Sequence, residues 1–97
     1  GILVIGGTLI PMGKEPGTVQ EVSRQAVNDW IRTSRTFDEV IDFDAMVRDP
    51  TAPWRIYPAW AAPAFNGNAY HPNAMGHTVM GQEIALGVFR DLWGADS

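Results

Sequence analysis

Short apolar and polar stretches alternate along the first half of the chain and predict a strand, a loop and a helix. The first stretch, Ile2 to Ile5, is apolar throughout, mostly β-branched, and ends at Gly6-Gly7. A strand with no polar position is typical of a parallel sheet that is buried on both faces. Residues 8 to 17 contain two prolines and two glycines and are expected to form a loop.

A helix is predicted from Thr18 to Ser34. Thr18-Val19-Gln20-Glu21 fits a capping box, in which the threonine hydroxyl accepts a hydrogen bond from the Glu21 amide. Apolar residues follow at helical spacing and are expected to face the core, with polar residues on the opposite side. The apolar set is Val19, Val22, Ala26, Val27, Trp30 and Ile31, and the polar set is Gln20, Arg24 and Asn28.

The second half of the chain begins with another strand, between Phe37 and Phe43, centred on Val40-Ile41-Asp42-Phe43. With the first strand and the helix it makes one βαβ unit. A short helical turn is expected over residues 45–48, and then a long loop over residues 50–73. Asn73 is a suitable cap for a last helix that runs to about Trp93, and its glycines Gly76, Gly81 and Gly87 indicate tight packing.

These elements predict an α/β fold with a short parallel sheet and flanking helices, in one domain over residues 1–97. Two strands are too few for an independently stable sheet. We therefore expect the sheet to be completed by a second copy, by strand pairing across a symmetric interface, or by a missing N-terminal half. The chain begins without Met on a strand-like run, which favours a processed, truncated or excised piece.

Composition narrows the function classes. Eleven acidic residues outnumber seven basic ones, the net charge is -4 and no Lys/Arg cluster occurs. This charge distribution disfavours binding to nucleic acid. The longest apolar run is far shorter than the roughly twenty residues that span a bilayer. No cysteine is present, so the redox compartment and the localisation stay undetermined. Gly6-Gly7-Thr8 lacks the spacing of a phosphate-binding loop, and no cofactor is expected.

His71 is the most informative single residue. It ends the long loop, precedes Pro72 and stands just before a predicted helix, so it projects from a well-defined backbone that suits a general base. The alternative is an ordinary loop histidine bonded to a nearby carbonyl group. His77, six residues later, either joins it in a metal site or faces solvent, and solvent is favoured.

Asp42 and Asp44 are also candidates for chemistry. Alternate residues of a strand share one face, near the sheet edge where ligands of α/β folds gather. A metal pair is one interpretation, but Asp44 equally suits an N-cap for residues 45–48, and no histidine accompanies the pair at ligand spacing. We therefore expect no metal.

Several segments together resemble the second half of the SGNH (GDSL-type) ester hydrolases. They are the first strand with Gly6-Gly7-Thr8-Leu9, then Val27-Asn28-Asp29-Trp30-Ile31-Arg32, Val40-Ile41-Asp42-Phe43-Asp44, Arg48-Asp49-Pro50 and His71-Pro72-Asn73-Ala74-Met75-Gly76. The resemblance covers nearly the whole chain. It implies a partial three-layer SGNH-hydrolase-like fold and an esterase acting on small carboxylic esters.

The resemblance also implies roles for two residues. His71 matches the family's general base, whereas Asn68 occupies the position of the aspartate that orients the imidazole. In a serine triad, an Asp-to-Asn change lowers turnover by about ten-thousand-fold. The family's serine and oxyanion-hole blocks would lie before Gly1, and none of Ser23, Ser34 and Ser97 fits the nucleophile.

The long loop concentrates aromatic side chains: Trp54, Tyr57, Trp60, Phe65 and Tyr70. In a complete hydrolase they would flank the acyl pocket, but a core or an oligomer interface is favoured.

The sequence supports two functional hypotheses. The first is an esterase with His71 as base and a nucleophile from outside the segment. The second is a non-catalytic, self-associating remnant of such a hydrolase.

Overall fold

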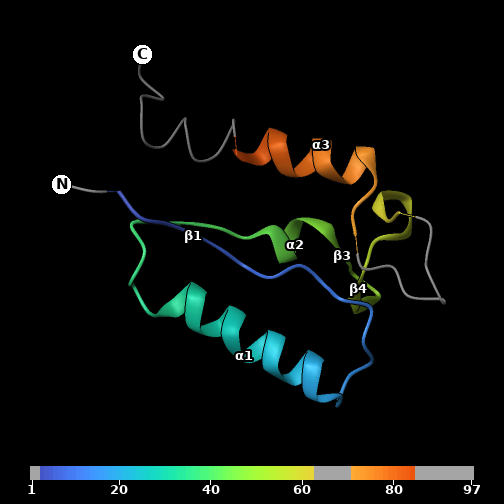
Figure 1. Cartoon of the computed structure of the whole chain (residues 1–97), viewed down its shortest axis with the longest axis horizontal. Coiled ribbons are helices and arrows are strands. Elements are labelled where there is room, and N and C mark those ends of the chain that lie inside the picture. The colour runs from blue at the N-terminus through green and yellow to red at the C-terminus, as the bar shows by residue number, and fades with distance from the viewer. Residues whose placement is uncertain (1–2, 63–70, 85–97) are drawn as a thin grey trace.

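The computed structural model describes residues 3–62 and 71–84, and its mixed helices and strands confirm the α/β class. Two strands lie between a long helix on one side and a shorter helix on the other (Figure 1). In chain order the elements are β1 (Ile5–Gly7), α1 (Val19–Thr33), β2 (Glu39–Ile41), α2 (Phe43–Val47), β3 (Arg48–Asp49), β4 (Ala52–Ile56), the 3-10 turn η1 (Pro58–Trp60) and α3 (Ala74–Glu83).

The predicted parallel pairing of the first two strands is confirmed. β1 and β2 form a two-stranded parallel sheet in which Ile5, Gly6 and Gly7 face Glu39, Val40 and Ile41. The first strand begins later than predicted, and the prediction that it is buried on both faces is wrong. Leu3, Val4 and Ile5 are almost half exposed, so the described residues cover the faces of this segment only in part.

Both ends of α1 follow the prediction, but its orientation does not. The Thr18 hydroxyl accepts from the Glu21 amide at 3.2 Å, and Ser34 caps the other end. The polar residues Arg24 and Asn28, expected outside, are 1% and 0% exposed. The apolar residues expected inside are largely exposed: Val19, Val22, Ala26, Val27 and Trp30. Ile31 alone of that set is buried.

The segment after β2 differs from the prediction in two ways. Asp42, not Asp44, is the N-cap, since its carboxylate accepts from the Ala45 amide at 3.1 Å, and the helix begins at Phe43. The expected loop over residues 50–73 contains regular structure, because β3 and β4 form an antiparallel hairpin with a register shift at Arg48/Asp49. The turn η1 follows it directly.

The last helix begins where Asn73 predicts. The Asn73 side chain accepts from the Gly76 amide at 2.9 Å, and α3 extends to Glu83. The predicted extension to Trp93, with Gly87, lies outside the described residues. A Cβ atom at Gly76 would lie 2.6 Å from the Trp60 carbonyl oxygen, which confirms tight packing there, whereas at Gly81 it would meet open space.

The core of the described residues is small and mixes apolar with polar side chains. Its buried apolar residues are Pro11, Ile31, Val47, Ala52, Ile56 and Pro72, and its buried polar ones are Thr8, Glu21, Arg24, Asn28, Asp44 and Asp49. Every fully buried side-chain polar atom among them has a hydrogen-bond partner. The described helices are all too short or too polar to cross a bilayer.

Candidate functional site

The carboxyl ends of β1 and β2 bring together two polar residues that directly follow these strands. Thr8 comes after β1 and is 5% exposed, and its hydroxyl donates to Asp42, which comes after β2, at 2.9 Å. The same hydroxyl accepts from the Asp44 amide at 2.9 Å. Parallel strands end at one edge, so these residues meet where ligands of α/β folds bind. Asp42 and Asp44 lie at this edge as expected, but in the start of α2 rather than on a strand.

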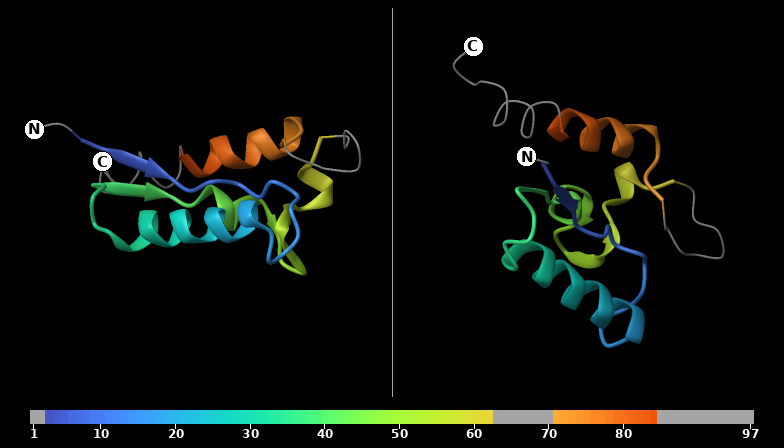
Figure 2. Two further views of the ribbon diagram at one scale, coloured as in Figure 1. Left: turned by 60° about the horizontal axis from the view of Figure 1, so that its bottom comes forward. Right: turned by 60° about the vertical axis from the view of Figure 1, so that its left-hand side comes forward.

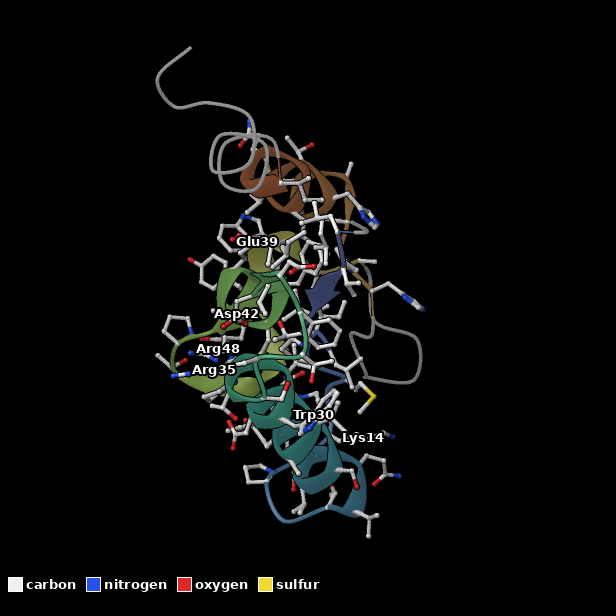
Figure 3. All side chains as sticks on the ribbon, turned by 90° about the vertical axis from the view of Figure 1, so that its left-hand side faces the viewer. Lys14, Trp30, Arg35, Glu39, Asp42 and Arg48 are labelled. Carbon is white, nitrogen blue, oxygen red and sulfur yellow. The ribbon has the colours of Figure 1, made fainter. Side chains whose placement is uncertain are left out.

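Three arginines surround Asp44, whose side chain is fully buried. Arg24 Nη1 lies 2.5 Å from Oδ1, and Arg32 Nη2 and Arg48 Nη1 lie 2.9 and 3.0 Å from Oδ2. Arg32 also binds Asp42 with two hydrogen bonds, of 2.8 and 3.0 Å. Arg48 and Asp42 lie on the same flank of the molecule (Figure 3). Guanidinium groups therefore occupy the oxygens that a metal ion would need, and the described residues contain no group of three or more metal-ligating side chains.

Arg24 joins this cluster to the rest of the chain. Its Nε and Nη2 bind the Glu21 carboxylate, both at 2.7 Å. The remaining bonds of Nη1 and Nη2 go to the carbonyl oxygens of Leu9, at 3.2 Å, and Pro53, at 3.1 Å. Asn28 adds two bonds to the Leu9 backbone, of 2.7 and 2.9 Å. We call the ion pairs among Glu21, Arg24, Arg32, Asp42, Asp44 and Arg48 the arginine–carboxylate cluster.

Three groups of the cluster, Asp42, Arg24 and Arg32, keep their charge near neutral pH. Burial by itself would raise the pKa of Asp42, but hydrogen bonds from Arg32, the Ala45 amide and Thr8 outweigh it and hold the pKa at about 2. Burial opposes the charge of Arg24, yet Glu21 and Asp44 raise its pKa above the usual value. The hydrogen bonds of Arg32 to Asp42 likewise raise its pKa. These three groups stay ionised and do not exchange protons near pH 7, so they serve architecture rather than acid–base catalysis.

His71 lies on a backbone that is held on both sides. The Ala62 amide donates to the His71 carbonyl at 2.8 Å, and Ala61 and Pro72 form an isolated antiparallel bridge. The Asn73 amide donates to the Trp60 carbonyl at 2.7 Å. His71 is exposed. The segment thus presents an imidazole at the surface from a fixed backbone, as its sequence context predicts.

Asn73 does more than the sequence indicates. Besides capping α3, its side-chain amide donates to the carbonyl oxygens of Ala59, at 2.9 Å, and Ala61, at 3.3 Å. One side chain therefore joins the start of α3 to the middle of η1 and to the residue that directly follows η1. Its position two residues after His71 and directly before a helix predicted the cap but gave no sign of the second contact.

The other candidates have simpler places. His77 is exposed on α3, as expected. Ser23 is exposed on α1, and the Ser34 hydroxyl accepts from the Thr36 amide at 3.3 Å. In the aromatic group, Tyr57 and Trp60 contact edge-to-face with ring centroids 5.1 Å apart. Asn68, Phe65, Tyr70 and Ser97 lie outside the described residues.

The low pKa of Asp42 gives a testable pH dependence. Because the pKa of Asp42 in the folded state lies below its usual value of 3.8, the folded state binds fewer protons than the unfolded state. Asp42 therefore stabilises the fold fully above pH 3.8, and this contribution is lost as the pH falls to about 2. We expect Asp42→Asn to lower the free energy of unfolding at neutral pH and to flatten its decline on acidification. Urea unfolding of both proteins at about pH 7, 4 and 2.5 measures this. Equal declines would contradict it.

Comparison of the sequence with protein-family models and with curated proteins finds no match. A functional assignment therefore depends on the chain's own residues and their arrangement.

Proposed function

We propose that the chain forms part of an esterase-type hydrolase for small carboxylic esters, in which His71 is the general base. The observation that carries the proposal is an exposed imidazole on a backbone fixed by the Ala62 hydrogen bond and the Ala61–Pro72 bridge. Both parallel strands point toward the end of the molecule where η1 and the start of α3 lie (Figure 2). Active sites of α/β folds gather at this end.

In this proposal, His71 takes the proton of a hydroxyl nucleophile supplied from outside this segment. The hydroxyl oxygen bonds to the ester carbonyl carbon, the carbon–alkoxide bond breaks, and His71 returns the proton to the leaving alcohol. Water then repeats the sequence and releases the acid. The proposed role of Asn68, carried over from the family resemblance, is to orient the ring through its second nitrogen. An amide supplies no negative charge, so we expect slower turnover than in an aspartate-containing triad.

The test is hydrolysis of p-nitrophenyl acetate by the chain together with the polypeptide that supplies its nucleophile, and by the same assembly carrying each of three variants. We expect His71→Ala to lose at least about a hundredfold in turnover, since a general base contributes that much or more. Asn68→Asp is expected to raise turnover by about tenfold or more, because it adds charge beside the imidazolium. His77→Ala is the matched control for the direct reaction of a surface imidazole with the ester, and it should leave turnover unchanged. An equal loss in the two alanine variants, or no turnover above buffer, would contradict the proposal.

A second candidate function, self-association of a non-catalytic remnant, has its own observation. Six exposed residues of α1 form an uncharged group that we call the outer stripe, and Gln20, Asp29 and Thr33 are exposed beside it; the stripe is Val19, Val22, Ser23, Ala26, Val27 and Trp30. None is charged, and Val19 and Trp30 are 79% and 53% exposed. The arginine–carboxylate cluster holds the opposite face of α1 against the core, so the helix cannot rotate to bury the outer stripe.

The occupant we propose for the outer stripe is a second copy of the chain. The stripe is symmetric about the midpoint between Arg24 and Gln25, as Val19 matches Trp30, Val22 matches Val27 and Ser23 matches Ala26. A two-fold interface requires this kind of self-complementarity, because each residue meets its counterpart from the other end. Two antiparallel α1 helices would place the small pair Ser23 and Ala26 at the crossing, where they allow close approach.

Sedimentation or light scattering across a concentration series tests this interface. We expect a monomer–dimer equilibrium that Val22→Asp weakens by at least about tenfold, because it buries an unpaired carboxylate. Met75→Asp is the matched control, since Met75 on α3 has the same exposed fraction of 57% as Val22. A monomer at every concentration, or equal weakening by both variants, would contradict self-association through α1.

A further inference from the structure

An open cavity separate from the arginine–carboxylate cluster's buried centre lies beside α2, the hairpin and η1. Its volume is about 570 Å³, and the residues that line it are Ala45, Met46, Arg48, Pro50, Tyr57 and Trp60. Small-molecule sites commonly have about 300–1,000 Å³ and mostly apolar walls with a few polar groups. The cavity matches this description in both volume and lining.

The aromatic part of the cavity is fixed by a ring contact. Tyr57 and Trp60 meet at an angle of 63° between ring planes, and Tyr57 remains 41% exposed. The Tyr57 amide donates to the Val47 carbonyl at 2.8 Å, and the Trp60 amide donates to the Tyr57 carbonyl at 2.9 Å. These bonds tie the aromatic wall to the end of α2. Aromatic faces held in this way are suited to a planar apolar group.

Arg48 gives the cavity its polarity, because among the described lining residues it is the one with a charge. Its side chain is 38% exposed, and it donates to the described residues through Nη1, to Asp44 Oδ2, while Nε and Nη2 donate to none of them. Asp44 is shared with Arg24 and Arg32, each of which also binds a second carboxylate. Arg48 is therefore the arginine of the cluster whose positive charge is least neutralised by carboxylates. Its Nε and Nη2 donors suit an anion.

We propose that this cavity binds a small aromatic carboxylate. The planar body would lie against Tyr57 and Trp60, and the carboxylate would accept hydrogen bonds from the Nε and Nη2 atoms of Arg48. A guanidinium fork fits a carboxylate with two parallel hydrogen bonds. The absence of any acidic side chain among the described lining residues disfavours a cationic ligand. This site involves neither His71 nor the outer stripe, so it is independent of both proposed functions.

The test is a titration of the chain with 2-naphthoate. Binding is measured by calorimetry and by the change in the NMR chemical shift of the Trp60 indole N–H. We expect saturable binding and a shift of that signal. The neutral analogue 2-naphthamide should bind at least about tenfold more weakly, since it cannot form the charge-assisted pair. This comparison uses the unaltered protein and so does not depend on whether a variant folds.

Two variants complete the test. Arg48→Gln is expected to weaken 2-naphthoate binding by at least about tenfold. Arg55→Gln is the matched control, because Arg55 is also exposed and paired with an aspartate, Asp49 at 2.8 Å, but does not line the cavity. It should change the affinity by less than about twofold. Equal affinities for acid and amide, an unchanged affinity in Arg48→Gln, or no saturable binding of 2-naphthoate would overturn the proposal.

Discussion

The buried guanidinium of Arg24 is the interaction on which the described structure depends. Its side chain is fully buried and makes five hydrogen bonds, to Glu21, Asp44 and the carbonyl oxygens of Leu9 and Pro53. These partners come from α1, α2, the loop after β1 and β4. A guanidinium has five N–H donors, so none is left unsatisfied. Removing one partner of such a buried pair typically costs about 3–5 kcal/mol, because the remaining charge stays buried. For a core with few buried apolar side chains, that is a decisive share of stability.

This interaction also determines which surfaces remain open. Because the polar face of α1 is committed to the interior, its valines and Trp30 point outward. Asp44 pairs with Arg24 and Arg32 as well as with Arg48. The positive charge of Arg48 is therefore only partly neutralised where Arg48 lines the cavity beside Tyr57. The backbone around His71 is fixed by different contacts, those of η1 and the start of α3. The base, the outer stripe and the cavity are thus separate features, and each proposal can fail without the others.

Local signals in the sequence were enough to predict the parts of the fold that depend on neighbouring residues. Thr18 and Asn73 cap helices where expected, because a cap is a contact over three residues. The face of α1 that is buried was not predictable in the same way. Hydrophobic periodicity assigns the apolar side to the core, but the partners that make Arg24 a core residue lie 15 to 29 residues away. The β3–β4 hairpin was missed because β3 is two residues long and β4 contains a proline. For the site, context predicted the place of His71, whereas Arg48 became notable once its contacts were known.

The most direct test of this account is the hydrogen-exchange rate of arginine Nε–H groups, measured by NMR on the unaltered chain. Arg24 Nε donates to Glu21 at 2.7 Å inside the core, whereas Arg35, just after α1, is exposed. We predict that the Arg24 Nε–H exchanges at least about a hundredfold more slowly than that of Arg35, because exchange requires the core to open. Equal rates for the two groups would contradict the inward orientation of Arg24 and, with it, the assignment of the outer stripe.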